Sequence, residues 1–223
     1  MTILKSQVFG RSLVGVYLSG NNSRIFYPPT LLKPTFKKFK NTFEEPFCPL
    51  TINNSNLLGV YIASNINGII LPDLIRDDEL ALLRTNVSGD MNIGVIKSID
   101  NAFGNLILCN DKGAIISTFL KNNKKEIEDI LNVETVVYEF ADSNLPGSIS
   151  LANNKGCLVT PLANDEEIEF LSSILKVDEI DVSTINRGMP YLNSGAVVND
   201  KSGIFGVDST GPEMMRLSNV LGL

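Results

Sequence analysis

The side chains that could act as nucleophiles in this chain of 223 residues are those of three cysteines, Cys48, Cys109 and Cys157. They lie far apart and form no Cys-x-x-Cys pair, so the sequence predicts neither a disulfide framework nor a cysteine-based metal site. Thiols packed as small apolar side chains are the simplest interpretation. The chain has no histidine, which removes the usual general base, the commonest zinc ligand and the Ser-His and Cys-His pairs. We therefore predict that the protein is not an enzyme and has no catalytic residue, metal site or cofactor.

Three adjacent carboxylates, Asp77, Asp78 and Glu79, could in principle bind a metal or act as acids and bases. They directly precede an apolar stretch that begins at Leu80 and has helical spacing. Acidic residues are favoured in the first turn of a helix because they complement its dipole and cap its free N–H groups. The sequence therefore favours a helix start here over a reactive site.

Regularly spaced glycines divide the chain into repeats. The glycines that precede an apolar stretch recur in steps of 44, 45, 43 and 48 residues, at Gly15, Gly59, Gly104, Gly147 and Gly195. Periods of 20 to 50 residues are typical of propellers and solenoids. We predict a single domain of five repeats of about 45 residues, with approximate bounds 1–46, 47–94, 95–135, 136–180 and 181–223.

Each repeat is predicted to contain two strands joined by a polar turn, then a helix, with an extra strand that enters from the preceding linker. First strands are expected at residues 13–18, 57–63, 105–109 and 148–151. Capping boxes are expected at Asn123 with Glu126, Asn164 with Glu167 and Thr210 with Glu213. A helix with one apolar stripe and a sheet with one apolar face cannot be buried alone. Five units in a circle would place strands near the axis, helices outside and the polar turns at one end.

Charge and hydropathy restrict the partners. The net charge of −6 argues against a general nucleic-acid coat and suits a basic protein partner. No apolar run approaches the ~18–20 residues that span a bilayer, and the N-terminus does not have the apolar core of a signal peptide. We expect a cytoplasmic protein without membrane contact. Lysines at 33, 37, 38 and 40 could contact RNA or acidic lipid, although a solvated outer helix face is the simpler interpretation.

Four segments carry a resemblance to a known family: residues 53–72, 78–80, 103–115 and 185–210. The most specific pattern is Asn-Arg-Gly at 186–188 followed by Gly-Ala-Val-Val-Asn-Asp at 195–200. The chain resembles archaeal and eukaryotic translation initiation factor 6, a family of ribosome anti-association factors. The resemblance covers essentially the whole chain and is weakest in the first repeat. It implies an α/β fold in the form of a five-bladed, pseudo-fivefold propeller of the pentein type.

The resemblance also implies a function. The protein would bind the intersubunit face of the large ribosomal subunit, chiefly through a basic ribosomal protein near the sarcin-ricin loop, with at most minor contact to ribosomal RNA. Binding there would sterically prevent the small subunit from joining, and a role in large-subunit biogenesis is also implied. We expect a monomer. The alternative is a ring-shaped scaffold for another basic protein; the pentein hydrolases and amidinotransferases are excluded because they need a histidine.

The residues expected to contact the partner are mainly polar residues of turns and strand ends on one face. Asparagine can both donate and accept hydrogen bonds, and aspartate can pair with basic groups. The same residue types also form tight turns, and an arginine at 187 could equally pair internally with an aspartate. The sequence leaves these alternatives open. The candidates are Asn65, Gly104, Asn105, Asn110, Asp111, Asn154, Asn186, Arg187, Asn199 and Asp200.

Overall fold

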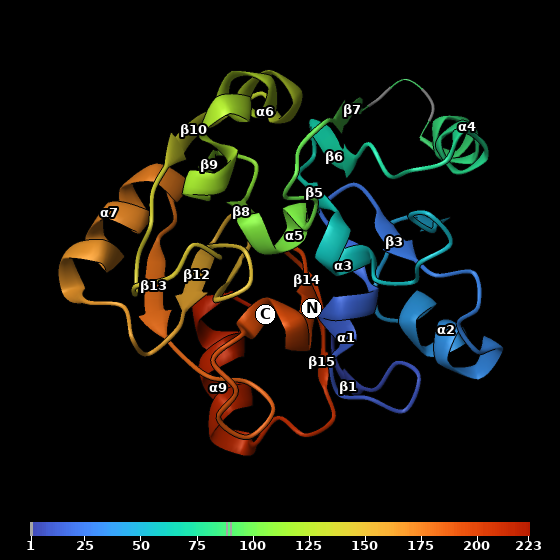
Figure 1. Cartoon of the computed structure of the whole chain (residues 1–223). Coiled ribbons are helices and arrows are strands. Elements are labelled where there is room, and N and C mark those ends of the chain that lie inside the picture. The colour runs from blue at the N-terminus through green and yellow to red at the C-terminus, as the bar shows by residue number, and fades with distance from the viewer. Residues whose placement is uncertain (1, 88, 90) are drawn as a thin grey trace.

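The computed structural model describes residues 2–87, 89 and 91–223 and is a mixed α/β structure. Within these residues the strands form five small sheets of three strands each. Figure 1 shows the five units following one another around the centre of the molecule, with short helices near the centre and longer helices outside. The predicted α/β class is confirmed, and the five sheets agree with the predicted fivefold repeat.

The elements recur in nearly the same order in each unit. The first unit has α1 (Val14–Tyr17), β2 (Ser19–Gly20), β3 (Ile25–Tyr27), α2 (Lys33–Lys40) and β4 (Phe47–Pro49). The second has α3 (Leu58–Tyr61), β5 (Ala63–Ser64), β6 (Gly68–Pro72), α4 (Asp77–Asn86) and β7 (Asn92–Ile96). The third has α5 (Phe103–Leu106), β8 (Ile107–Cys109), β9 (Gly113–Ile116), the 3-10 helix η1 (Thr118–Asn123), α6 (Lys124–Leu131) and β10 (Glu134–Val137).

The last two units follow the same plan. The fourth has β11 (Ser150–Ala152), β12 (Gly156–Val159), α7 (Asp165–Leu175) and β13 (Glu179–Val182). The fifth has α8 (Leu192–Gly195), β14 (Ala196–Val198), β15 (Ser202–Gly206) and α9 (Gly211–Val220). The third strand of its sheet is β1 (Thr2–Ser6), from the other end of the chain.

Every sheet combines an antiparallel hairpin with one parallel strand. In the first four units the parallel strand follows the outer helix and pairs with the second strand of the hairpin, as β7 does with β6. It was expected to enter from the preceding linker, and that prediction was wrong. In the fifth unit β1 takes this place, with register from Thr2↔Ser202 to Ser6↔Gly206. The first and last segments of the chain thus share one sheet.

Three of the four segments predicted as first strands, 13–18, 57–63 and 105–109, overlap instead the single helical turns α1, α3 and α5, and the strands that follow are short. The fourth, 148–151, overlaps β11. Close packing of these turns explains the repeated glycines. A Cβ on Gly59 would overlap the carbonyl oxygen of Gly15, and a Cβ on Gly104 would overlap that of Gly59. Continuous strands were predicted because four residues are too few to show a helical period.

The outer helices bury one residue at the equivalent position in every unit. Capping boxes form at Asn164 with Glu167 and at Thr210 with Glu213, as predicted. Asn123 does not cap α6, because the 3-10 helix runs directly into it. Full burial of one apolar side chain of an outer helix contributes about 1.5–3 kcal/mol. The equivalent residues, each 0 % exposed, are Phe39, Leu83, Ile127, Leu171 and Leu217.

No helix within residues 2–87, 89 and 91–223 is both long and apolar enough to cross a membrane.

Candidate binding surfaces

Buried asparagines form the hairpin turns. Each unit has one at the first position of its turn, and all five are no more than 7 % exposed. In Asn110, Oδ1 accepts hydrogen bonds from the backbone N–H groups of Lys112 at 2.9 Å and Gly113 at 3.0 Å. This is the asparagine turn in which the side chain takes the place of a backbone acceptor. The five residues are Asn21, Asn65, Asn110, Asn153 and Asn199.

The amide nitrogens of Asn21, Asn65, Asn110 and Asn153 join neighbouring units. Nδ2 of Asn110 donates to the carbonyl oxygens of Asn153 at 3.1 Å and Leu175 at 2.9 Å. Asn65 does the same toward Asn110 and Leu131 in the third unit. The amides of Asn65, Asn110 and Asn153 therefore bond to the next hairpin turn and to the C-terminal end of the next outer helix, whose carbonyls have no partner within the helix. The hydrogen-bonding groups of Asn65 and Asn110 are used inside the protein.

The residue that follows each turn asparagine forms a second set of contacts between units. Nδ2 of Asn154 donates to Oδ2 of Asp111 at 2.6 Å and to Oδ2 of Asp200 at 2.9 Å. Asn22 donates to the same two oxygens at 2.8 and 2.9 Å. The other carboxylate oxygens accept backbone N–H groups, from Ile66 to Asp111 and from Asn154 to Asp200, both at 2.8 Å. Both carboxylates are therefore engaged within the protein.

Gly104 and Asn105 lie in α5, at the start of β8, whereas the hairpin turn lies at the other end of that strand. The carbonyl oxygen of Gly104 accepts a hydrogen bond from Nδ2 of Asn193 at 3.4 Å, and that of Asn105 accepts from the backbone of Ser148 at 3.2 Å. Asn105 is half-buried, and its side chain makes no hydrogen bond to any residue that the structure describes. Gly104 is therefore required for close packing, while the amide of Asn105 has no partner among the described residues.

Asn186 and Arg187 form a tight turn before α8, with φ of 52° and 67°. Nδ2 of Asn186 donates to the carbonyl oxygen of Ser12 at 3.0 Å, which connects the fifth unit to the segment before α1. The side chain of Arg187 is exposed and has no acidic partner within the described part of the chain. The internal Arg–Asp pair considered from the sequence is thus not present there. This turn lies at the end of the molecule that carries the short helices.

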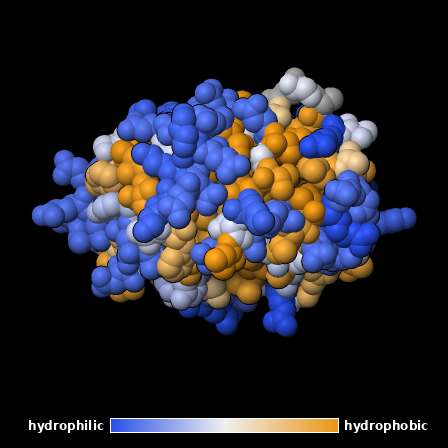
Figure 2. Space-filling model, turned by 45° about the horizontal axis from the view of Figure 1, so that its top comes forward, coloured by the Kyte–Doolittle hydropathy of each residue, from blue (hydrophilic) through white to orange (hydrophobic). Residues whose placement is uncertain are grey.

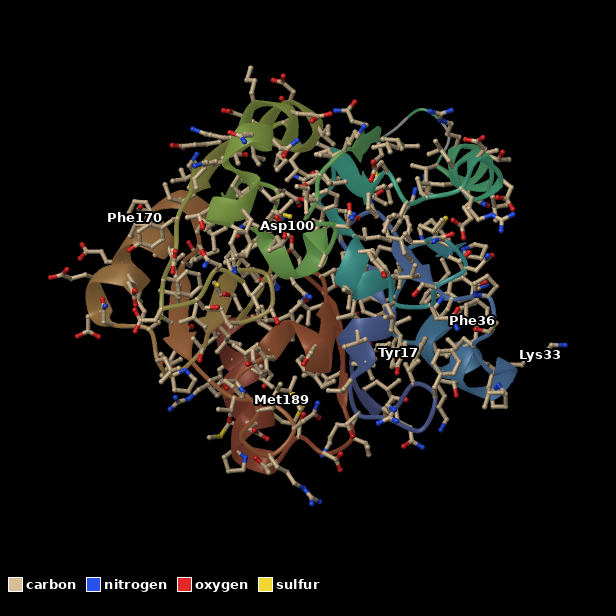
Figure 3. All side chains as sticks on the ribbon, viewed as in Figure 1. Tyr17, Lys33, Phe36, Asp100, Phe170 and Met189 are labelled. Atoms are coloured by element: carbon tan, nitrogen blue, oxygen red, sulfur yellow. The ribbon has the colours of Figure 1, made fainter. Side chains whose placement is uncertain are left out.

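The candidates are therefore divided between two ends of the molecule. Figure 3 labels Tyr17 in α1, Asp100 just before α5 and Met189 just before α8, which belong to the short-helix end. Gly104, Asn105, Asn186 and Arg187 also lie at this end. The remaining candidates lie at the hairpin-turn end, and these are Asn65, Asn110, Asp111, Asn154, Asn199 and Asp200.

Three asparagines that form hydrogen bonds between hairpin turns were not among the candidates predicted from the sequence, and these are Asn21, Asn22 and Asn153. The available signal was the repeat itself, because an asparagine recurs in steps of 44, 45, 43 and 46 residues from Asn21 to Asn199. The sequence also did not show that the predicted capping-box residue Glu213 contacts a second segment of the chain. Glu213, 8 % exposed, accepts hydrogen bonds from the turn before α8 as well as from its own helix start.

Glu213 is held as a carboxylate. Burial alone would raise its pKa, but hydrogen bonds from the backbone N–H groups of Thr210 and Gly188 and from the hydroxyls of Thr184 and Thr210 outweigh this and lower the pKa from 4.5 to about 2. A lowered pKa in the folded state stabilises the fold fully above about pH 4.5, and this contribution is lost as the pH falls toward 2.

We expect Glu213→Gln to lower the free energy of unfolding by about 2 kcal/mol at pH 7, because charge-assisted hydrogen bonds are lost. The difference from wild type should shrink between pH 4.5 and 2, as measured by urea unfolding. Glu169→Gln, an exposed position in α7, is the matched control and should change stability little. A Glu213→Gln effect that is the same at pH 7 and pH 2.5 would contradict this role.

Two of the three cysteines behave as core residues, and the half-buried Cys109 packs against the core. Cys48 and Cys157 are buried, and burial raises the pKa of the Cys157 thiol to about 12 and that of Cys48 to about 11. Both thiols are therefore protonated near neutral pH and are poor nucleophiles. The described residues contain no group of three or more His, Cys, Asp or Glu side chains that could hold a metal ion.

The five sheets, the packed short helices and the turn asparagines that connect the units define the class of this molecule as a repeat-built α/β protein. Residues 3–220 match the model of the eIF-6 family. This chain belongs to the eIF-6 family.

Several curated relatives extend over almost the same length. The chain is 37% identical to translation initiation factor 6 of Methanococcus vannielii, with 99% of each chain covered. It is 36% identical to the factors of that name from Pyrobaculum aerophilum, with 97% of each chain covered, and from Methanocaldococcus jannaschii, with 99% of this chain and 98% of the relative covered.

Proposed function

We propose that this protein is a translation initiation factor that binds the large ribosomal subunit at its intersubunit face and sterically prevents the small subunit from joining. Full-length similarity to proteins named translation initiation factor 6 carries this proposal. We further propose that it acts in the cytoplasm as a monomer, that it needs no cofactor, that it takes part in large-subunit biogenesis, and that its main contact is a basic ribosomal protein near the sarcin-ricin loop.

We also infer that the fold is a closed, five-bladed propeller of the pentein type and forms one domain of five repeats. Three contacts between the first and last units support closure. β1 pairs with β15, Asn186 bonds to the carbonyl of Ser12, and the backbone N–H of Asp200 donates to Asn22 at 2.9 Å.

The short-helix end is the better candidate for the ribosome-binding face. At the hairpin-turn end, the candidate amides and carboxylates are mostly engaged with neighbouring turns. At the short-helix end, the side chains of Asn105 and Arg187 have no partner among the described residues. Two apolar side chains that precede α5 and α8 are exposed, Ile99 at 97 % and Tyr191 at 47 %. Figure 2 shows hydrophobic surface near the centre of its view, bordered by hydrophilic residues. A mixed surface of this kind is typical of protein interfaces, which have apolar centres and polar rims.

Anti-association needs no reacting group. A factor that binds one subunit where the other must dock excludes the second partner by occupying its space, so affinity and position determine the effect. Stable protein interfaces bury about 1,200–2,000 Å² in total. Contacts on a single end of the molecule are enough for this mechanism.

The function is tested by sedimentation of the protein with salt-washed large subunits, followed by addition of small subunits. We expect stoichiometric co-sedimentation and a loss of joined ribosomes. If wild type does not bind large subunits, the function is wrong and the alternative, a scaffold for another basic protein, becomes the one to pursue.

The choice of face is tested by Asn105→Ala combined with Arg187→Ala, which should weaken binding to large subunits about tenfold or more, since two polar contacts are lost. Thermal unfolding should be unchanged. The matched control is Ile66→Ala, an exposed side chain of a hairpin turn, which should bind normally. Weakened binding by Ile66→Ala with normal binding by the double variant would place the interface at the hairpin-turn end.

A further inference from the structure

Helix α2 carries an unusual concentration of positive charge for this chain. Four of its eight residues are lysines and none is acidic, although the whole chain has a net charge of −6. Lys33, Lys37 and Lys40 are spaced four and three residues apart, so they share one side of the helix. All four lysines are exposed. The helix α7 on the opposite side of the molecule has four acidic residues and no basic one (Figure 1).

The lysines of α2 are not neutralised by the protein. In the part of the chain that the structure describes, none of the four lies within 4.0 Å of a carboxylate, whereas Lys125, Lys176 and Lys201 each do. Lysines spaced by one turn repel one another. Figure 3 shows Lys33 extending away from the protein, with Phe36 on the same helix. The positive charge is therefore available to an external anion.

A groove of about 410 Å³ extends this surface toward the hairpin turns. Its lining includes Lys40, Lys155 and Lys201 together with two carboxylates, Glu44 and Asp200. Glu44 is paired with Lys201 at 3.2 Å, and Asp200 accepts the hydrogen bonds from neighbouring turns described above. Lysines of two further hairpin turns thus lie beside the last lysine of α2.

The same junction contains an unused donor. The side-chain amides of Asn65, Asn110 and Asn153 each donate a hydrogen bond to a carbonyl oxygen at the C-terminal end of the outer helix in the following unit, as Asn110 does to Leu175. Asn199 leads from the fifth unit to α2, and its buried Nδ2 has no hydrogen-bond partner among the described residues. Of the four junctions that follow Asn65, Asn110, Asn153 and Asn199, the one between the last and first units is therefore the one without this hydrogen bond in the described part of the chain.

We propose that the lysines of α2 and the adjoining groove form a second contact surface, which binds the phosphate backbone of RNA. The inference rests on the proposed function, in which ribosomal RNA is the available polyanion. Evenly spaced lysines fit a chain of phosphates, and such contacts supply affinity without base recognition. A membrane-surface helix would need an exposed apolar face, but Phe39 is fully buried and Phe36 stacks on Tyr27 with 4.5 Å between ring centres.

The test measures binding of a fluorescent 20-base-pair RNA duplex, and separately of large subunits, at several KCl concentrations. The triple variant Lys33→Glu, Lys37→Glu, Lys40→Glu should bind the duplex at least about tenfold more weakly than wild type at 0.1 M salt. The slope of log affinity against log salt should decrease in magnitude by about two to three, because each phosphate contact contributes somewhat less than one. Large-subunit binding should show the same decrease in slope.

The matched control is Lys121→Glu, Lys124→Glu, Lys125→Glu, which changes the net charge equally on exposed lysines of the third unit. It should keep most of the duplex affinity, and both triple variants should unfold at the wild-type temperature. Equal losses in the two variants, or no duplex binding by wild type, would overturn the inference. Wild-type binding to phosphatidylserine vesicles but not to RNA would overturn it in favour of a membrane contact. Failure of wild type to bind large subunits would instead remove the proposed function, while the duplex assay would still decide whether α2 binds RNA.

Discussion

Gly59→Ala is expected to lower the free energy of unfolding by about 3 kcal/mol, at the upper end of the usual cost of overpacking. Its Cβ would overlap the backbone carbonyl oxygen of Gly15 and approach that of Leu18, and backbone atoms cannot move away as the end of a side chain can. The measurement is urea unfolding followed by circular dichroism.

Gly211→Ala is the control for this prediction. Gly211 opens α9, and a Cβ there meets no atom within 4 Å, so alanine should be neutral or stabilise by up to about 1 kcal/mol. If Gly59→Ala were as stable as Gly211→Ala, the short helices would not be packed through their backbones as the structure has them.

Asn110→Ala is expected to destabilise the protein by about 3–5 kcal/mol. The substitution leaves two backbone N–H groups of the turn and two carbonyl oxygens of the fourth unit without their partner. Each buried polar group without a hydrogen bond costs about 1–3 kcal/mol, and water entering the site would recover part of this. Denaturant unfolding measures the loss.

Asn122→Ala provides the comparison, since Asn122 is exposed in the 3-10 helix and a surface substitution usually changes stability by less than about 0.5 kcal/mol. A loss below 1 kcal/mol in Asn110→Ala would contradict the structural role of the turn asparagines.

The sequence was sufficient to predict the repeat, because glycines recur where close packing of the backbone requires them. It was not sufficient to predict the short helices. Residues such as Gly15 and Val16 lie in an apolar run that also fits a strand, and only contact with the neighbouring helical turn selects the helix. The pairing of β1 with β15 was equally hidden, since no local pattern at Thr2–Ser6 indicates a partner near the other end of the chain.

The candidate site could be predicted only in part for a related reason. The sequence around an asparagine such as Asn65 does not show whether its amide faces solvent or a neighbouring unit. The hydrogen bond from Asn65 to Leu131 can be recognised only from the fold. Arg187 shows the opposite case. Its position after Asn186 predicts a turn, and the turn leaves its side chain exposed, so this position remains a reasonable prediction for binding.

The pairing of β1 with β15 also determines when the protein can complete its fold during synthesis. Thr2 and Ser202 are 200 positions apart, and elongation at about 5–20 residues per second separates their appearance by roughly 10–40 seconds. The hairpins of the earlier units need only local partners and can form as they emerge. The sheet that contains β1 must wait until β15 has left the exit tunnel, so β1 remains an unpaired strand until then.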